Sequence, residues 1–584
     1  MESYRLDGRI ARRFLRFAGG FWRGESAKSA WLLTFGLALF LMLSTGVTLG
    51  LNRWQKWFFD ALERKDVEAA GWAVLVFVAI IAAMAAIGVG IVMTREYLQV
   101  RWRAWLVERL VVLWTGRNRF YHLGARNTPL DNPEYRISDD TRWATEPMVD
   151  LVIGLFSAII GAAAFVTILW TVGGSYRLTL GSTSVLVPAY MVLVALVYGV
   201  FASGLILWVG RMLVRAVARK NAAEGEFRFA MMRVRENAES VALADGGPSE
   251  ERALKSLYGI VAERWFDIVR QHGRITWVTN ASGPMIPIVP LLFAAPKYFA
   301  GEVTLGEVVQ LGGAFVQVQL AISWIVDNYS RLSEWFASAR RVLDIVDACD
   351  TLDLSVGSRE GETIAIERSD GPDLRLEGLA VTGDDGRTIV SASGLVLRRG
   401  ERAHVHGGTG AGKTSLVRAL AGLWPSGRGR ILVPDGSRLM ILPQKPYLPT
   451  GTLRNALLYP HEAPEVPETR LTEVLADVGL THLVPRLDSV ERWDQVLGTG
   501  ERQRLCLCRA FLHRPDIIVL DDALSALSEE TQAEMEARIM TRFSEAILIS
   551  FSQRTVAARG GMARFEIDRQ GEASRLRPLG QAVV

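Results

Sequence analysis

The chain of 584 residues is long enough for two large units, because single domains usually hold roughly 100–200 residues. Hydrophobic residues make up 49% of it and the mean hydropathy is +0.18, which is high for a soluble protein with 22% charged residues. A formal net charge of +4 is too small to indicate a nucleic-acid partner, and three cysteines do not suggest a disulfide framework.

Apolar residues are concentrated in the first 330 positions, where six segments are long enough to cross a bilayer. Crossing takes roughly 20 largely apolar residues. A run such as GWAVLVFVAIIAAMAAIGVGIVM has no polar face, although a helix of a soluble protein normally keeps one. No cleavable signal peptide is expected in the opening MESYRLDGRIARRFLRF. The predicted spans cover about 30–51, 71–93, 150–172, 183–210, 275–297 and 305–327.

Arginine and lysine orient these spans, because cytoplasmic loops carry an excess of both. They are abundant before span one, between spans two and three, and between spans four and five. These stretches are alternate loops, so both termini are predicted to be cytoplasmic. The inner loops also have helical patterns, and we expect the membrane helices to continue into the cytoplasm.

Three charged residues, Asp327, Arg331 and Glu334, share a helix face near the end of span six. A substrate or proton site is one interpretation. The favoured one is a solvated helix face with a local Asp–Arg pair.

The second half of the chain is predicted to be an α/β domain. Residues 346–372 are polar and rich in Gly, Ser, Asp and Glu, which is typical of a linker. Strand and helix patterns then alternate to near the C-terminus. The expected organisation is a six-helix transmembrane domain at 1–345, a linker at 346–372 and a soluble nucleotide-binding domain at 373–584. Nucleotide binding is predicted from the glycine-rich motif at 407–414.

The stretch GGTGAGKT at 407–414 follows the strand-like ERAHVHG and precedes the helical pattern SLVRALAGLW. Strand, glycine-rich turn and helix form the context of a phosphate-binding loop, whose backbone N–H groups wrap phosphate oxygens. Lys413 is expected to reach the β- and γ-phosphates, and the Thr414 hydroxyl to bind Mg²⁺. A plain tight turn is the alternative, and GKT in this context argues against it.

A second motif, DIIVLDD, is an apolar strand pattern that ends in Asp521 and Asp522. Acids at the carboxyl end of a strand beside a phosphate loop can hold the metal and position water. An exposed strand-end acid without function is the alternative. Together the two motifs predict a P-loop ATPase domain that uses ATP and Mg²⁺.

The order of further motifs resembles the ABC ATPases. Gln444 in ILPQKPY is similar to the family's Q-loop, and LGTGERQR at 497–504 is similar to its signature motif with the QR continuation. Asp521 matches the Walker B aspartate and 525–528 matches the D-loop. Gln553 in SFSQR stands where the family has the switch histidine.

The resemblance implies roles for these residues. Asp522, Gln553 and Gln444 would act in catalysis, and Mg²⁺ would be held by Thr414, Gln444 and Asp521. ATP would be contacted by the phosphate loop and the signature motif: Gly407, Gly408, Thr409, Gly410, Ala411, Gly412, Lys413, Thr414, Ser415, Gly498, Thr499, Gly500 and Glu501.

The membrane half resembles one branch of the family, through LNRWQKWFFDALERKD, EYLQVRWRAWL, YHLGARNTPLDNPEYRISDD and RFAMMRVRENAESVAL. The branch holds the SbmA/BacA-like bacterial peptide and cobalamin uptake proteins and the peroxisomal fatty-acyl half-transporters. This resemblance implies a polytopic α-helical membrane domain of the exporter-type ABC fold in the bacterial inner membrane. The transported solute would be a peptide or another bulky hydrophilic molecule.

The chain departs from the family pattern within its site. Asp522 replaces a glutamate and is one methylene shorter, and losing general-base help costs roughly 10²–10⁴-fold. Gln553 replaces a histidine and can donate a hydrogen bond but carries no charge. Gly498 and Thr499 replace a serine and a glycine of the signature motif, and Ser528 replaces the D-loop aspartate. ATP binding is therefore expected to survive better than hydrolysis.

These departures also bear on assembly. In the family, each ATP site combines the phosphate loop of one subunit with the signature motif of the other. Here both altered parts lie in one chain, so a partner with regular motifs would leave two impaired sites. A homodimer with two slow sites is therefore favoured.

Three functions fit these observations. ATP-dependent transport is favoured. A transporter that binds ATP but is driven mainly by an ion gradient is the second, because some relatives of the membrane half lack the ATPase domain. A nucleotide-gated regulator of a membrane complex is the third. Uptake that follows ATP or collapses with the proton gradient separates the first two.

Overall fold

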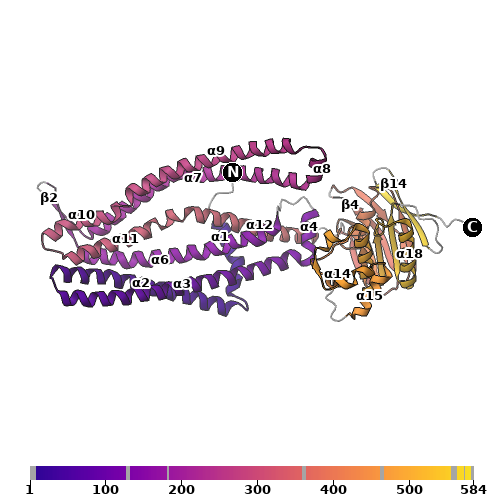
Figure 1. The fold of residues 1–584 in the computed structure, drawn as a ribbon, viewed down its shortest axis with the longest axis horizontal. Helices are drawn as coiled ribbons and strands as arrows, with labels where there is room; N and C mark the ends of the chain where they lie inside the picture. Colours follow the sequence, from indigo (N-terminus) through magenta and orange to yellow (C-terminus); the bar gives the residue numbers. More distant parts are fainter. Residues whose placement is uncertain are drawn as a thin grey trace, which may run out of the picture. The chain divides into compact units, whose positions relative to one another are not determined.

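The computed structural model describes residues 8–125, 132–180, 183–357, 363–383, 385–460, 466–553, 562–570 and 573–579. The chain divides into two compact units. One comprises Met1–Gly116 and Pro129–Ala348, and the other comprises Arg117–Thr128 and Cys349–Val584. Long helices make up the first unit, and a sheet flanked by helices makes up the second (Figure 1).

Six helical stretches of the described chain are long and apolar enough to cross a membrane, which confirms the predicted number. Helices α2 and α3 run side by side, as do α7 and α9 (Figure 1). Several of these helices exceed the roughly 20 residues that a bilayer requires. The stretches are built from α2 (Ala27–Glu63), α3 (Val67–Thr115), α6 (Thr141–Gly173), α7 (Tyr190–Glu236), α9 (Gly247–Ser282), α10 (Met285–Phe299), α11 (Leu305–Asp327) and α12 (Tyr329–Gly357). Shorter helices are α1 (Gly8–Ala18), α4 (Arg119–Ala125), α5 (Pro133–Tyr135) and α8 (Ala238–Leu243).

One predicted span needs correction, and a second, which lies within the membrane-crossing stretch Gly247–Phe299, contains a break in the helix. The span predicted at 183–210 is wrong in its first residues, because Thr183–Val187 is strand β2, paired antiparallel with β1 (Tyr176–Leu180). The β-branched residues of TSVLV favour a strand, and α7 begins only after the following proline. The span at 275–297 is interrupted between α9 and α10, where Pro284 lacks the N–H that a continuous helix needs.

The predicted local pair between Asp327 and Arg331 is also wrong. Arg331 Nη2 donates instead to Asp150 of α6 at 2.9 Å, and Asp327 accepts from Ser323 Oγ at 2.8 Å. Asp150 additionally accepts from Gln99 of α3 at 2.9 Å. Since α11 ends at Asp327 and α12 begins two residues later, the two charges do not share one continuous helix.

The second unit is built on an 11-stranded mixed sheet, which confirms the predicted α/β domain. Its order is β3-β8-β4-β5-β15-β14-β7-β13-β12-β9, and β6 pairs with β4. Strands β14, β7, β13, β12 and β9 are parallel neighbours. The strands are β3 (Ala365–Ser369), β4 (Leu374–Thr382), β5 (Thr388–Ala392), β6 (Leu395–Leu397), β7 (Arg402–His406), β8 (Gly427–Pro434), β9 (Leu439–Leu442), β12 (Ile517–Asp521), β13 (Ile547–Ser552), β14 (Met562–Gln570) and β15 (Ala573–Pro578). A separate pair is β10 (Gly451–Thr452) with β11 (Val490–Glu491).

Helices cover both faces of this sheet. Val405, Val519 and Ile549 pack into one apolar cluster with α13 (Lys413–Leu420). Their strand neighbours Ile518 and Leu548 point the other way and join a cluster with α17 and α18. Alternate residues of a strand face opposite sides, so each central strand contributes to both clusters. The remaining helices are α14 (Leu453–Leu458), α15 (Glu468–Asp477), α16 (Trp493–Val496), α17 (Thr499–His513) and α18 (Glu529–Arg542).

The range 346–372, which the sequence predicts to be a linker, has regular secondary structure at both ends. Helix α12 continues to Gly357, and β3 begins at Ala365. Residues 358–362 lie outside the described part of the chain.

Candidate functional site

The glycine-rich loop joins the end of β7 to the start of α13. Gly410 and Gly412 adopt φ angles of 78° and 97°, which glycine takes without steric cost. A Cβ at Gly412 would lie 3.0 Å from Val390 Cβ, so the loop leaves no room for a side chain there. The exposed residues Gly408 and Thr409 lie next to the first turn of α13, where free backbone N–H groups favour an anion.

Lys413 is held inside this loop. Its side chain is buried, and Nζ donates to the carbonyl oxygens of Gly407 and of Gly408, the latter at 3.0 Å. A buried ammonium whose hydrogen bonds go to carbonyls of its own loop fits a phosphate-binding role. Thr414 is exposed beside it, and Ala411 is buried beneath the loop.

The parallel order of the strands gathers the other predicted residues at one edge of the sheet. Strand β13 lies between β7 and β12, so the carboxyl ends of the three strands are neighbours. The phosphate loop follows β7, Asp521 ends β12, and Gln553 follows β13. Ligands of such sheets bind at this edge.

The carboxylate of Asp521 lies beside that of Asp522 and is affected by it. Burial raises the pKa of Asp521, and so does the neighbouring carboxylate of Asp522, whereas Lys413 and Arg418 oppose the shift. A bound cation would counteract both effects that raise this pKa. Asp521 therefore lies where a divalent metal ion would stabilise its charged form.

The potential Mg²⁺ ligands are all oxygen donors, as Mg²⁺ prefers: the Thr414 hydroxyl, the Gln444 amide and the Asp521 carboxylate. Within the described residues there is no group of three His, Cys, Asp or Glu side chains that could hold a metal by itself.

Asp522 sits in an uncommon backbone conformation, with φ of 48°. Its N–H donates to the Phe551 carbonyl of β13 at 3.1 Å, and its carbonyl accepts from the Ser525 N–H at 3.1 Å. Aspartate is among the few non-glycine residues that visit this region. The conformation turns the chain away from β12 at the residue that the sequence predicts to be catalytic.

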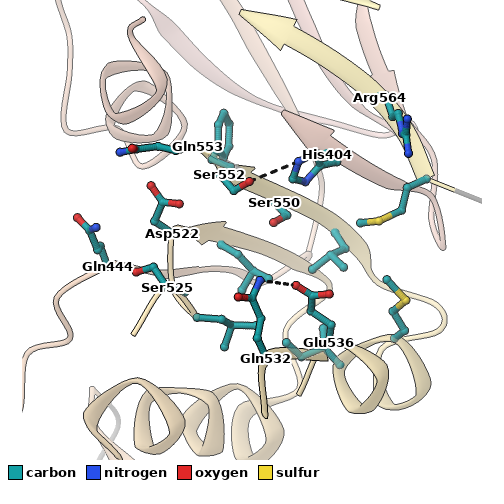
Figure 2. Close-up of a pocket in the computed structure, with 18 residues that line it drawn as sticks. His404, Gln444, Asp522, Ser525, Gln532, Glu536, Ser550, Ser552, Gln553 and Arg564 are labelled. Carbon is teal, nitrogen blue, oxygen red and sulfur yellow. Dashed lines mark hydrogen bonds between the residues drawn. The ribbon is translucent and has the colours of Figure 1, made fainter. Parts of the chain in front are cut away.

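A cavity of about 280 Å³ brings the three predicted catalytic residues together. Gln444, Asp522 and Gln553 line one part of it, between the ends of β12 and β13 (Figure 2). The cavity continues between the sheet and α18, past Ser552 and His404. None of the phosphate-loop or signature residues lines it.

The signature residues form the start of α17. Gly498 precedes the helix, and its N–H donates to Glu501 Oε2 at 3.0 Å. Thr499 Oγ1 accepts from Arg502 at 3.1 Å. Gly500 packs closely on the D-loop, because a Cβ there would lie 3.3 Å from the Ala526 carbonyl. Gly498 and Thr499 are exposed, so the positive end of this helix is accessible to an anion.

Ser528, which replaces the D-loop aspartate, has a structural role of its own. Its Oγ accepts from the Thr531 N–H at 3.3 Å and so caps α18. Serine is among the preferred N-cap residues. The replacement therefore preserves the start of this helix, although it removes a charge.

Gln503 connects three segments of the site, although its motif match alone predicts no role for it. Its side chain is buried in α17, where Nε2 donates to the Gln444 carbonyl at 3.1 Å. Its Oε1 accepts from the Ala526 N–H at 3.0 Å. One amide thus links the signature helix to both the Q-loop and the D-loop. The sequence does hold a signal for this role, because Gln503 belongs to the QR that follows the signature motif. A buried amide needs hydrogen-bond partners.

Replacing Gln503 with leucine should loosen both loops. The side chain keeps its approximate volume but loses three hydrogen bonds, the third being the one that Nε2 donates to Ser525 Oγ at 3.5 Å. Each is worth about 0.5–1.5 kcal/mol. We expect a lower thermal midpoint of unfolding together with lower ATP turnover. Gln495→Leu, an exposed position on α16, is the matched control and should leave both unchanged. A Gln503→Leu protein as stable and active as the wild type would contradict this linking role.

Comparisons with known proteins agree with the geometry. A family model for ABC transporter transmembrane region 2 matches residues 24–299, and one for ABC transporters matches 391–525. An uncharacterized ABC transporter ATP-binding protein of Synechocystis is 30% identical over 515 residues, which cover 86% of this chain and 76% of that protein. The lysosomal cobalamin transporter of Homo sapiens is 27% identical over 578 residues, covering 91% of this chain and 90% of that protein.

A solved structure supports the same fold. A bacterial Atm1-family ABC exporter with ATP bound matches with a TM-score of 0.68, covering 97% of this chain and 95% of that one. At 16% identity this likeness shows the fold alone. The expected exporter-type fold is confirmed.

Proposed function

This chain belongs to the ABC transporter family as a fused half-transporter whose ATPase is coupled to transport, and from that premise we propose that it hydrolyses ATP slowly to take up a bulky hydrophilic solute. A peptide-like molecule is the solute class that we favour. The membrane would be the bacterial inner membrane, with the ATPase domain and both termini cytoplasmic. The main observation that supports hydrolysis at this site is the cavity that Gln444, Asp522 and Gln553 line together.

The chemistry assigned to this chain starts with binding of the nucleotide. Lys413 and the N–H groups of residues 407–415 would hold the phosphates, and Thr414, Gln444 and Asp521 would bind Mg²⁺, which neutralises phosphate charge when bound. Asp522 would accept a proton from the water that attacks the γ-phosphorus. The bond to the β-phosphate oxygen breaks, and ADP leaves with its electron pair.

The rate should be low because two groups of this machinery are weakened. The Asp522 carboxylate is one methylene shorter than a glutamate, so it holds the attacking water less well. Gln553 can donate a hydrogen bond to the γ-phosphate but adds no positive charge. Residues 498–501 of a second copy would complete the site through their helix terminus, as in the family. We therefore propose a homodimer with two equivalent slow sites.

Asp522→Glu tests this explanation of the rate. The added methylene should restore reach toward the water, and ATP turnover should rise about tenfold or more, within the range of general-base help. Steady-state hydrolysis in lipid nanodiscs measures it, with Asp494→Glu at an exposed position of α16 as the control. Unchanged or reduced turnover would mean that the length of this side chain does not limit the reaction.

A gradient-driven transporter is the second candidate. The cross-helix pair of Asp150 and Arg331 places two ionisable groups at or just beyond the ends of the predicted spans 150–172 and 305–327, and the amide of Gln99 donates to the same carboxylate. Uptake into proteoliposomes separates the candidates. ATP-dependent uptake without a pH gradient supports the first, and uptake that needs only the gradient supports the second.

A further inference from the structure

A short amphipathic helix, α1, precedes the first membrane span. One of its faces is buried, because Phe14 and Ala18 are fully covered and Phe21 of the following turn is buried with them. Phe14 packs against Trp102 of α3 and Trp335 of α12, with ring centroids 6.5 Å and 5.8 Å apart. Trp102 Nε1 also donates to the Ala18 carbonyl at 3.0 Å. These contacts fix α1 to two of the long helices.

The face of α1 opposite these contacts is basic. Successive residues of an α-helix lie about 100° apart around its axis, which places Arg12 and Arg16 nearly opposite Phe14. Both arginines are exposed. The stretch 8–28 carries a net charge of +5, with six basic residues and one acidic residue: Arg9, Arg12, Arg13, Arg16, Arg23 and Lys28 against Glu25. The exposed side of this helix therefore suits an anionic partner.

The two edges of α1 face different surroundings. On one edge, the guanidinium of Arg109 lies over the Phe17 ring, 5.3 Å from its centroid. Since α3 extends beyond its predicted span before it reaches Arg109, this edge faces away from the bilayer. Arg13, four residues before Phe17 and so on the same edge, pairs with Asp347 of α12. Leu15 is two residues from both and therefore lies on the opposite edge, which faces the bilayer.

The turn after α1 reaches the level of the membrane. Trp22 Nε1 donates to Thr34 Oγ1 at 3.0 Å, and Thr34 belongs to the span predicted at 30–51. Trp31 and Phe35 are exposed on the first turns of α2 and stack with centroids 5.2 Å apart. Aromatic residues in such positions mark the membrane interface. An apolar side chain toward the bilayer, here Leu15 at 43% exposure, beside a basic face is the pattern of an interfacial helix.

We propose that α1 binds the headgroups of anionic phospholipids, with Arg12 and Arg16 on the headgroup phosphates and Leu15 among the acyl chains. The partner follows from charge complementarity, because the cytoplasmic leaflet is negatively charged and arginine matches phosphate oxygens with a planar fork of N–H groups. Each basic side chain near such a surface strengthens binding about fivefold. This lipid site goes beyond the proposed ATP-driven transport and does not depend on ATP hydrolysis.

The experiment identifies the lipid that lies next to position 15. All three cysteines of the chain are buried, so a thiol-reactive fluorophore should label Leu15→Cys selectively in the full chain. Two nanodisc samples hold the same mixture of phosphatidylglycerol and phosphatidylcholine, and only one of the two lipids carries brominated, quenching acyl chains in each. Quenching should show a preference for phosphatidylglycerol of about fivefold or more. Arg12→Gln/Arg16→Gln should reduce it toward equality, whereas the matched control Arg398→Gln/Arg428→Gln, at exposed positions of the second unit, should keep it.

Salt gives a second test that needs no arginine variant to fold. Raising the ionic strength from about 0.1 M to 1 M shortens the Debye length from about 10 Å to 3 Å, so the preference should shrink. Equal quenching by both lipids with the arginines intact, or quenching by neither, would overturn the lipid site. A preference that survives in Arg12→Gln/Arg16→Gln would do the same, as would its loss in protein that no longer assembles with a second copy. Protein that shows the preference but no ATP turnover would contradict the proposed function and leave the lipid site standing.

Discussion

Asp522→Asn should lower ATP turnover by about 10²-fold or more while ATP still binds. The carboxylate lies at the end of β12 in the cavity shared with Gln444 and Gln553, where it is the only group of the three that can accept a proton at neutral pH. Asparagine has nearly the same shape and can keep the backbone bonds to Phe551 and Ser525, so the fold should persist. Steady-state hydrolysis measures the loss.

A binding measurement separates chemistry from folding in this variant. ATP affinity should not fall, because a carboxylate repels the phosphates and asparagine removes that repulsion. Asp494→Asn at an exposed position of α16 is the matched control and should hydrolyse at the wild-type rate. An Asp522→Asn protein with wild-type turnover would show that the proton leaves by another route.

Lys413→Ala should weaken ATP binding by about 10- to 100-fold. It should also remove measurable turnover, because no lysine then stabilises the charge of the transferred phosphoryl group. A hydrogen bond to a charged group contributes about 1.5–3 kcal/mol, and Lys413 would exchange its bonds to the carbonyls of Gly407 and Gly408 for bonds to phosphate. Titration with a fluorescent ATP analogue measures the affinity.

The control for this variant is Lys255→Ala, an exposed lysine of α9 that pairs with Glu251. It should bind nucleotide as the wild type does. If Lys413→Ala kept wild-type affinity, the buried ammonium would serve the fold of the loop, and the phosphates would be held by backbone groups alone.

The sequence predicted the features that depend on local chemistry. A glycine-rich turn that ends in GKT between a strand and a helix indicates a phosphate loop. The positive φ angles of Gly410 and Gly412 explain why those positions hold glycine. The number of spans follows from composition alone. The β1–β2 hairpin was not predicted, because the valines of β2 fit the apolar pattern of a membrane span as well as that of a strand.

Features that depend on distant partners could not be predicted. Arg331 pairs with Asp150 across 181 positions, and the local alternative with Asp327 was equally compatible with the sequence. The alternation of polar and apolar residues in RAHVH does indicate that His404 faces away from Val405. Its approach to Ser552, 148 positions away, is set by the pairing of β7 with β13.

The central claim, that this chain hydrolyses ATP slowly at Asp522, is tested most directly by wild-type turnover in lipid nanodiscs against Lys413→Ala as background. The structure predicts a low rate that stands clearly above that background and disappears in Asp522→Asn. A wild-type rate equal to the background, in protein that binds ATP, would contradict the claim and favour a gradient-driven transporter or a nucleotide-gated regulator.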